Sequence, residues 1–595
     1  MVVRPMDARD KLREIFGFQG FRPGQAESVD AALRNRDALV VMPTGSGKSV
    51  CYQLPALIRD DLTLVVSPLV SLMADQVAAL ERVAPGRVAV VNAQRGFGAN
   101  AAALQEVREG TVRLLYIAPE RFGSPRFIDA LAGVRVGLFV VDEAHCVSQW
   151  GHDFRPDYFT LADAAARVSA CATLALTATA TPRVADDIVR RLRLRDPVRV
   201  TTGFDRPNLS FAVVGCRGGL DKERRLAAAL AEPGALPAIV YAGTRDATER
   251  LARALAGALD ARTVVYHAGM DRGARAAAQQ RFMSGEAEVI VATNAFGMGI
   301  DKADVRTVCH ATVPGSLEAY YQEAGRAGRD GRPARCLLFA EQRDKGLHVF
   351  FIQRAHVELT AIERVGERLN WAGIDGRYDV ALSELAGLAS DRRDDEAVRA
   401  IIGHLARAGV LVPTPAPYDR AAGTITGGFD RRAAALCMGS AREAERVRWA
   451  QYRAVWEYVE GTRCRREALL AHFGDRSRGA PSVECCDVCA PSLVAAPPAA
   501  VAAGAPPAGS GGGDLDSAIT RVVSAARPAV GRTRAVEILR GGRSKIVVQN
   551  AYDGLPDYGA FAHLRSEDVL GRVDELLAAG TLRSSGGRFP KLRAA

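Results

Sequence analysis

The chain has 595 residues, of which 48% are hydrophobic and 25% charged, the composition of an ordinary globular protein with roughly three to five domains. No apolar stretch approaches the roughly 18 residues of a membrane-spanning helix, and no signal peptide begins the sequence, so we expect a cytoplasmic protein without a membrane partner. The formal net charge of +10 favours a polyanionic partner such as nucleic acid.

A glycine-rich turn at residues 42–49 follows the first apolar run, residues 38–41, and precedes a stretch that can begin a helix. Between a strand and a helix, such a turn can cradle a triphosphate with its backbone N–H groups. Lys48 would reach the β- and γ-phosphates, and the Ser49 hydroxyl would bind Mg²⁺. The match is partial, because the full pattern has a glycine where this chain has Met42. The residues expected to bind ATP here are Thr44, Gly45, Ser46, Gly47, Lys48 and Ser49.

A motif ahead of this turn, residues 16–25, supplies candidates for contact with the adenine base. The Gln25 amide offers both donors and acceptors, which suits the edge of adenine. Arg22 can stack on the base.

Apolar runs alternate with helical patterns at residues 62–67, 88–92, 112–117 and 138–141. Strands that alternate with helices predict a doubly wound parallel sheet, whose ligands lie at the carboxyl ends of the strands. The segments 67–72 and 118–121 each follow a strand. They would either contact a phosphate backbone or form ordinary strand-to-helix turns.

Two adjacent carboxylates, Asp142 and Glu143, follow the run 138–141. Near a phosphate-binding turn, one acid can hold Mg²⁺ and the other can act on water. We expect Asp142 to bind Mg²⁺, and Glu143 to orient and deprotonate the attacking water.

The loop after these carboxylates combines aromatic side chains with arginine. Such combinations form stacking platforms for single-stranded bases, although a small satellite core is the alternative. The expected DNA-binding residues are Trp150, Phe154, Arg155 and Tyr158. Farther along, the hydroxyls of the segment 176–180 would relay contacts between lobes.

As a set, these motifs resemble the RecQ family of superfamily 2 DNA helicases. The matching segments are Phe-Arg-Pro-Gly-Gln (21–25), Thr-Gly-Ser-Gly-Lys-Ser (44–49), Asp-Glu-Ala-His (142–145), Ser-Gln-Trp-Gly-His-Asp-Phe-Arg-Pro (148–156) and Leu-Thr-Ala-Thr-Ala (176–180). The resemblance implies two RecA-like lobes that close on ATP. It also implies translocation on single-stranded DNA and 3′-to-5′ unwinding of duplex or branched DNA in recombination and repair.

The expected second lobe begins after the hinge segment 204–209 and includes a strand and turn at 238–243 and a helix at 244–258. Asp301, at the end of the segment 291–301, is a further candidate for the nucleotide site. In the segment 320–331, two arginines three positions apart on a helical pattern would share a face. By its match to the family motif, Arg329 resembles the arginine finger, with Arg326 beside it.

The segment 379–429 is an insert that we do not expect at this place in shorter bacterial RecQ proteins. Helices are predicted at 382–386 and 396–408, and strands of a hairpin at 409–412 and 423–427. Two helices followed by a hairpin are typical of a winged helix, which often binds the DNA major groove. A spacer or a protein-docking module fits equally well.

Four of the 11 cysteines cluster late in the chain. The pair Cys486 and Cys489 has the spacing of a zinc knuckle, and Cys464 on a helix can add a third thiolate. The group resembles the zinc-binding subdomain of RecQ helicases, but the first position of the later trio is Val483, and Cys485 is offset. We expect Zn²⁺ bound by Cys464, Cys485, Cys486 and Cys489, with His472 as a substitute for Cys485.

The last segments are a tether rich in Ala, Pro, Gly and Ser, and a domain that resembles the RecQ C-terminal winged helix. In that domain a helix is expected at 567–579, and strands 581–585 and 588–592 would form a hairpin. The expected divisions are lobe 1 at 1–206, lobe 2 at 207–345, a helical segment with the insert at 346–440, the zinc-binding subdomain at 441–492, a linker at 493–514 and the winged helix at 515–595.

The sequence therefore predicts an α/β ATP-dependent DNA helicase with ATP, Mg²⁺ and structural Zn²⁺. A DNA-stimulated ATPase that translocates or anneals without unwinding is the first alternative, and a DNA-binding structural protein and an RNA helicase are others. Single-stranded and branched DNA are the expected partners, and bacterial nucleoid association is expected. The sequence names no single-strand-binding or repair protein as a partner.

Overall fold

The computed structural model comprises a large unit, residues 1–498, and a small C-terminal unit, residues 499–595. The residues that the structure describes are 5–68, 70–92, 95–123, 125–148, 156–297, 302–371, 373, 375–390, 395–414, 416, 419–494, 515–542, 544–555, 557–562, 564–585 and 590–594. The expected linker falls almost entirely outside them. Among the described residues, no helix has the length and apolarity needed to cross a membrane.

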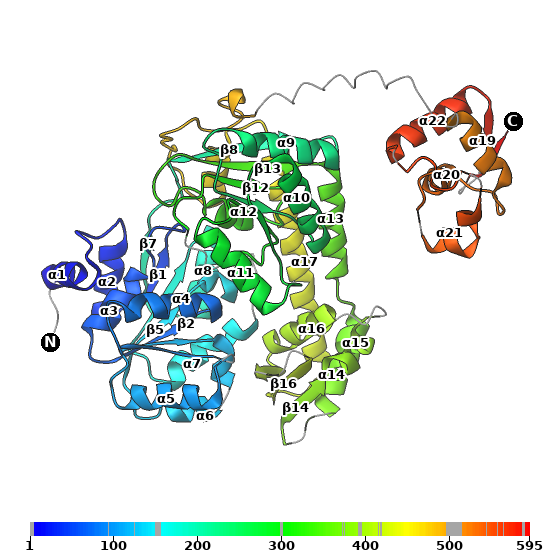
Figure 1. Ribbon diagram of the computed structural model, residues 1–595. Coiled ribbons are helices and arrows are strands. Elements are labelled where there is room, and N and C mark those ends of the chain that lie inside the picture. The colour runs from blue at the N-terminus through cyan, green and yellow to red at the C-terminus, as the bar shows by residue number, and fades with distance from the viewer. Residues whose placement is uncertain are drawn as a thin grey trace. The chain divides into compact units, whose positions relative to one another are not determined.

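Lobe 1 is a seven-stranded parallel sheet in the order β3-β4-β2-β5-β6-β1-β7 (Figure 1). Its strands are β1 (Ala38–Val41), β2 (Leu62–Val66), β3 (Val88–Val91), β4 (Leu114–Ile117), β5 (Val136–Val141), β6 (Ala172–Thr177) and β7 (Val198–Thr201). Its helices are α1 (Pro5–Phe16), α2 (Gln25–Leu33), α3 (Val50–Ile58), α4 (Val70–Glu81), α5 (Phe97–Arg108), α6 (Pro125–Ala130), α7 (Leu161–Arg167) and α8 (Pro182–Arg191), with 3₁₀ turns η1 (Pro119–Gly123), η2 (Ala144–Val147) and η3 (Pro156–Thr160).

Lobe 2 is a six-stranded parallel sheet in the order β10-β11-β9-β12-β13-β8. Its strands are β8 (Leu209–Gly215), β9 (Ala238–Tyr241), β10 (Thr263–Tyr266), β11 (Val289–Ala292), β12 (Thr307–His310) and β13 (Ala334–Ala340). Its helices are α9 (Gly219–Ala231), α10 (Arg245–Ala258), α11 (Arg272–Met283), α12 (Leu317–Ala324) and α13 (Gln342–Arg354). The two doubly wound sheets confirm the predicted fold class.

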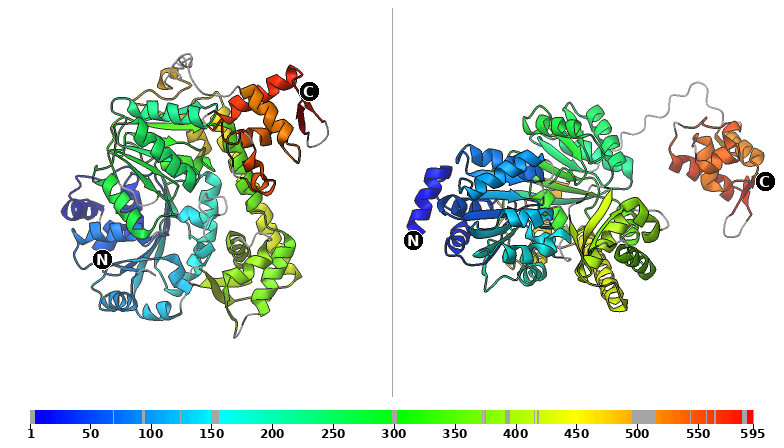
Figure 2. Two further views of the ribbon diagram at one scale, coloured as in Figure 1. Left: turned by 45° about the vertical axis from the view of Figure 1, so that its right-hand side comes forward. Right: turned by 90° about the horizontal axis from the view of Figure 1, so that it is seen from below.

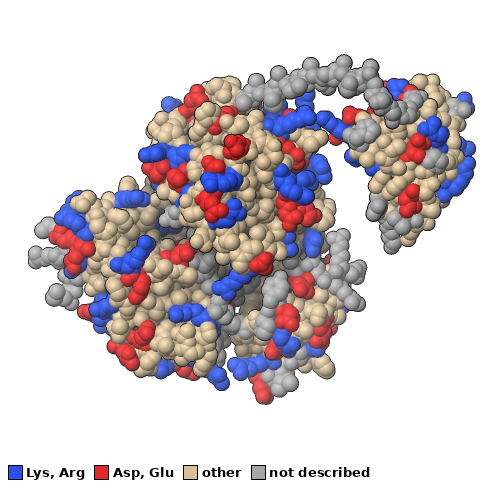
Figure 3. All heavy atoms as spheres, in the orientation of Figure 1, with Lys and Arg blue, Asp and Glu red and all other residues tan. Residues whose placement is uncertain are grey.

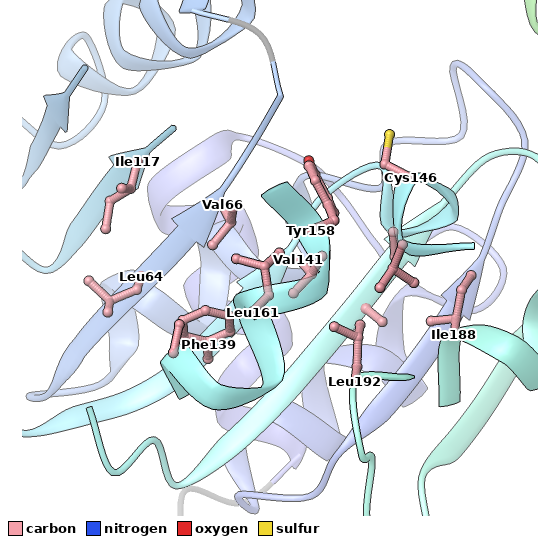
Figure 4. Packing of buried hydrophobic residues seen from close by; sticks show 14 of the residues in the cluster. Leu64, Val66, Ile117, Phe139, Val141, Cys146, Tyr158, Leu161, Ile188 and Leu192 are labelled. Atoms are coloured by element: carbon pink, nitrogen blue, oxygen red, sulfur yellow. The ribbon is translucent and has the colours of Figure 1, made fainter. Parts of the chain in front are cut away.

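Both faces of each sheet are buried, which explains the continuous apolar runs of the strands. In β5, Phe139 and Val141 point into one core of lobe 1, whereas Leu138 and Val140 point into the other, because side chains alternate along a strand. Figure 4 shows Phe139 and Val141 packed beside residues of β2, α7 and α8.

The insert is a separate small domain with its own core. It begins before the predicted bounds, 379–429, because α14 (Leu359–Trp371) packs into the same core. Its other elements are β14 (Arg377–Ala381), α15 (Leu382–Ala389), α16 (Asp395–Arg407), β15 (Leu411–Thr414) and β16 (Arg420–Ile425). The predicted hairpin is present as β15 and β16, and β14 extends it to an antiparallel sheet in the order β14-β16-β15. The long helix α17 (Arg431–Glu460) then returns from the insert to lobe 2 (Figures 1 and 2).

The insert packs against lobe 1 with its winged-helix elements. The helix α16 lies against η3, and β15 lies against η1. The Arg407 guanidinium carbon is 6.0 Å from the centroid of the Phe159 ring of η3. Arg183 of α8 also forms an ion pair of 3.6 Å with Glu443 of α17. In a winged helix, α16 would be the helix that binds DNA. Here α16 packs against lobe 1.

The zinc-binding subdomain contains α18 (Arg465–His472) and the short turn η4 (Pro491–Leu493). It covers β8, the edge strand of lobe 2: the Phe211 N–H donates to the Cys485 oxygen (3.2 Å), and the Asp487 N–H donates to the Phe211 oxygen (3.2 Å). The open edge of a sheet is thereby paired.

The C-terminal unit contains α19 (Leu515–Ala525), α20 (Arg532–Leu539), α21 (Lys545–Gln549), η5 (Tyr552–Gly554), α22 (Ser566–Ala578), β17 (Leu582–Ser584) and β18 (Leu592–Ala594). These elements enclose one hydrophobic core. The expected hairpin is present: β17 pairs with β18, and Ser584 lies opposite Leu592. Residues 586–589 of the predicted hairpin lie outside the described residues.

We expect Phe139→Ala to destabilise lobe 1 by about 3–5 kcal/mol, because it removes a fully buried ring from a close-packed core. Hydrogen exchange measured on peptides from β2 and β5 should show the loss of protection. The matched control is Phe97→Ala, since that ring is 87% exposed. Equal protection in both variants would contradict this assignment of the core.

Candidate active site

The phosphate-binding turn, residues 42–49, joins the carboxyl end of β1 to α3. Gly45 and Gly47 have φ angles of 83° and 84°, a region that glycine adopts without steric cost. The Ser46 hydroxyl donates to the Pro43 oxygen (2.6 Å), and Lys48 Nζ donates to the Met42 oxygen (3.2 Å). The turn is thus held by its own hydrogen bonds, with Lys48 folded back over it.

Arg22 and Gln25, which we expected near adenine, hold this turn from outside. Arg22 Nη1 donates to the Gly45 oxygen (2.9 Å), and Gln25 Nε2 donates to the Gly47 oxygen (3.0 Å). Gln25 Oε1 accepts from the Arg22 N–H (2.8 Å). Both side chains therefore contact the phosphate-binding turn. Their contact with the adenine base stays a prediction.

Asp142 and Glu143 follow β5 at the same edge of the sheet. The Asp142 N–H donates to the Val66 oxygen of β2 (2.9 Å), and Asp142 Oδ1 accepts from the Glu143 N–H (3.0 Å). Glu143 has a φ of 47°, a left-handed conformation that is uncommon for a residue with a side chain and often occurs at functional sites.

The two carboxylates and Lys48 are close enough to influence one another. Burial lowers the pKa of Lys48, and Glu143 and Asp142 act against that shift. Burial, and next the charge of Glu143, raise the pKa of Asp142, while Lys48 acts against them. An ammonium and two carboxylates thus share one edge of the sheet, where the first suits a phosphate and the others suit a metal ion.

His145 connects the carboxylates to the segment 176–180. Its Nδ1 lies 2.9 Å from the Thr177 hydroxyl and 3.4 Å from Glu143 Oε2. The imidazole is fully buried. The segment 176–180, which we expected to relay contacts between the lobes, therefore contacts His145 through the Thr177 hydroxyl. His145 in turn contacts Glu143.

Lobe 2 faces this site with the arginine turn, residues 325–331. The helix α12 ends at Ala324, so Arg326 and Arg329 lie in a turn and not on a helix as expected. A Cβ on Gly45 would lie 3.3 Å from Arg329 Cγ, and the charge of Arg329 lowers the pKa of Lys48, after burial and the effects of the two acids. Arg326 is buried nearby.

The expected DNA-binding loop is only partly described. Trp150, Phe154 and Arg155 lie outside the described residues, as does Asp301. Tyr158 is fully buried in the core of lobe 1 (Figure 4), and its hydroxyl donates to the main-chain oxygen of Asp142 (3.0 Å). This burial is inconsistent with base stacking by Tyr158, whose ring instead supports the segment that carries the carboxylates.

Charge on the visible face of the molecule is mixed. Figure 3 shows lysine and arginine interspersed with aspartate and glutamate. In the C-terminal unit, two arginines have partners within the unit: Arg532 with Asp574 (2.6 Å), and Arg540 with the Leu564 main-chain oxygen (2.8 Å). Net charge alone therefore does not locate a nucleic-acid site.

The four late cysteines come together, and their sulfur atoms all lie within 4.8 Å of one another. Cys464 caps α18, and its sulfur is 3.5 Å from that of Cys485. Burial would raise the pKa of Cys486, but backbone N–H groups, that of Arg465 first, lower it overall. Four thiols in one cluster fit the tetrahedral coordination of Zn²⁺. His472, the alternative ligand, instead pairs with Glu318 (2.8 Å).

Family comparisons cover most of the chain. Residues 22–188 match the DEAD/DEAH box helicase family, and residues 221–331 match the helicase conserved C-terminal domain. Residues 430–490 match the RecQ zinc-binding domain, and residues 514–595 match the RQC domain.

Several known proteins match about 60% of the chain at 39% to 42% identity. The chain is 39% identical over 360 residues to the probable ATP-dependent DNA helicase RecS of Bacillus subtilis, which covers 60% of this chain and 72% of that protein. It is 42% identical over 353 residues to the ATP-dependent DNA helicase RecQ of the same organism, 59% of each chain. The chain belongs to the RecQ family. A further RecQ relative, from Pasteurella multocida, is 40% identical over 367 residues. The matches span 59% and 57% of the two RecQ relatives, less than two thirds of their length.

One candidate residue is absent from the sequence-based set. Arg206, in the hinge segment of this RecQ protein, donates hydrogen bonds to the phosphate-binding turn and to the arginine turn. Its place in the segment Phe-Asp-Arg-Pro-Asn-Leu, 204–209, is the signal that could have pointed to it.

We expect Cys486→Ser to lose most of its zinc, because a structural site needs its four ligands. Metal analysis of dialysed protein should find about one zinc per chain in the unmodified protein and in the control Cys171→Ser. Cys171 lies outside the cluster. Unchanged zinc in Cys486→Ser would exclude Cys486 as a ligand.

Proposed function

We propose that this RecQ protein is an ATP-dependent DNA helicase that translocates 3′ to 5′ on single-stranded DNA and unwinds duplex or branched DNA. The observation that carries the proposal is the approach of Arg329 from lobe 2 to Gly45 in the phosphate-binding turn of lobe 1. Arginine supplied across a cleft makes hydrolysis depend on the closure of the lobes. The domain matches and the relatives support the same activity.

In this proposal the residues of lobe 1 bind and hydrolyse ATP. Lys48 and the N–H groups of the phosphate-binding turn hold the phosphates. The Ser49 hydroxyl and the Asp142 carboxylate are oxygen donors suited to Mg²⁺, which supplies charge neutralisation at the β- and γ-phosphates when bound. Glu143 orients the attacking water and accepts its proton.

Lobe 2 contributes at the transition state. Arg329 would stabilise the charge that develops on the γ-phosphate, with Arg326 beside it. Closure and opening of the lobes, each with its own grip on the sugar-phosphate backbone, would convert hydrolysis into stepping along one strand.

We expect Glu143→Gln to keep ATP binding and to lower turnover by roughly several hundredfold, because the amide cannot accept the proton from water. Steady-state ATPase and nucleotide binding should be measured on the same preparation. Glu109→Gln, a substitution in an exposed residue after α5, is the control. Normal turnover in Glu143→Gln would remove the role assigned to Glu143.

The function is tested by strand separation on a 3′-tailed and a 5′-tailed duplex, with ATP hydrolysis followed in the same tubes. The proposal expects separation from the 3′ tail alone, dependent on ATP and absent in Lys48→Ala. Separation from the 5′ tail alone would reverse the polarity. Protein without DNA-stimulated ATP hydrolysis would contradict a motor function.

A second candidate, a DNA-stimulated translocase with weak unwinding, is favoured by one observation. The insert packs against η3, which directly follows the loop expected to bind DNA. A domain in that position would obstruct entry of a duplex. ATP hydrolysis stimulated by single strands without separation would select this candidate.

A further inference from the structure

One side chain of the hinge segment contacts both sides of the candidate active site. Arg206 Nη1 donates to the main-chain oxygen of Thr44, in the phosphate-binding turn, at 3.3 Å. The remaining contacts are with main-chain oxygens of the arginine turn: Gly325 (3.1 Å), Ala327 (3.0 Å) and Gly328 (3.1 Å). A single guanidinium therefore joins the turn that would bind the phosphates to the turn that carries Arg326 and Arg329.

Arg206 makes these contacts as a partly buried charge. Among the described residues its hydrogen-bond partners are main-chain oxygens, and none is a carboxylate. A buried charge is tolerated only when its N–H groups are hydrogen-bonded, and the planar fork of arginine is suited to several acceptors at once. Separation of the two turns would break part of this set, so Arg206 favours the arrangement in which they adjoin.

The two turns also pack directly against each other. A Cβ on Gly325 would lie 3.6 Å from Thr44 Cβ, and a Cβ on Gly45 would lie 3.3 Å from Arg329 Cγ. At this separation, a small displacement of the arginine turn moves Arg329 relative to the phosphate-binding turn. Transition-state stabilisation is sensitive to displacements of about 1 Å.

The main chain of Arg206 accepts a hydrogen bond from Arg466 of α18. Arg466 is buried, and its Nη1 donates to the Arg206 oxygen (2.9 Å) and to Asp205 Oδ1. Asn208 Nδ2 donates to the Gly328 oxygen (2.8 Å), which fixes the arginine turn to the same segment. The backbone from which Arg206 extends is therefore anchored to the zinc-binding subdomain and to lobe 2.

We propose that Arg206 is a positioning residue for ATP hydrolysis, which holds the arginine turn against the phosphate-binding turn so that Arg329 can act on the γ-phosphate. The inference rests on the proposed function. Arg206 makes no contact with the reacting atoms in this role and acts through Arg329.

The test compares Arg206→Ala and Arg206→Lys with the unmodified full-length chain. Arg206→Ala should lower kcat for ATP roughly 100-fold, while the Kd for a non-hydrolysable ATP analogue changes by no more than about threefold. Affinity for ADP with aluminium fluoride, a transition-state analogue, should fall with kcat. Arg206→Lys keeps the charge but lacks the fork, so its kcat should be intermediate. Arg281→Ala, which removes an exposed arginine of α11, is the control.

A double-mutant cycle with Arg329→Ala separates positioning from a general structural effect. If Arg206 acts through Arg329, Arg206→Ala should lower kcat by no more than about twofold when Arg329 is already alanine. Full additivity, or an equal loss of affinity for both analogues, would overturn the inference, as would normal kcat in Arg206→Ala. If Arg206→Ala does not fold, Arg206→Lys serves in the same cycle.

The outcomes distinguish this inference from the proposed function. An unmodified chain that hydrolyses ATP, together with an unaffected Arg206→Lys and Arg206→Ala, overturns the positioning role alone. An unmodified chain without ATPase activity overturns the proposed function and this inference with it.

Discussion

Two parallel sheets can act on one nucleotide only if the loops at the carboxyl ends of their strands are held against each other. Each sheet buries both of its faces within its own lobe, so neither sheet requires the other. In this protein the requirement is met by the hinge segment 204–209. Its first ring, Phe204, stacks on Phe473 of the zinc-binding subdomain at 4.5 Å, and its main-chain oxygen accepts from the Tyr321 hydroxyl of lobe 2 (2.6 Å).

The zinc-binding subdomain is consequently part of the framework that joins the two lobes. It pairs with the edge of the lobe 2 sheet at Phe211, and Leu470 and Phe473 join a core of lobe 1. Cys464 of the thiol cluster lies at the start of α18, the helix that carries Leu470 and ends just before Phe473. The insert also connects the two lobes, because α17 packs on lobe 2 while α16 packs on lobe 1.

Most of the fold could be predicted, because its signals are local. Apolar runs bounded by turns predicted β1 to β5 of lobe 1, whereas β6 and β7 were not predicted. The Gly-Ser-Gly-Lys-Ser segment predicted the turn between β1 and α3. Other features depend on distant contacts. The aromatic character of Tyr158 suggested stacking on bases, but its hydroxyl meets the Asp142 oxygen inside lobe 1. The spacing of Arg326 and Arg329 fits a helix, yet α12 ends at Ala324 before the arginine turn packs against lobe 1. Cys485 is offset from the family pattern in sequence, but the fold brings its sulfur into the cluster of four thiols.

The contacts of Arg206 depend on residue type on the donor side only. On one side stands a single side chain, and on the other stand carbonyl groups that every residue type possesses. Substitutions at Thr44 or Ala327 leave those acceptors in place, so sequence change on that side is constrained only through backbone shape. Gly328 illustrates that constraint, since its φ is 54° and a Cβ there would lie 2.4 Å from Asn208 Nδ2. The contacts of Arg206 therefore constrain the residue type at positions 206 and 328 more than at Thr44 or Ala327, whose contribution is a main-chain oxygen.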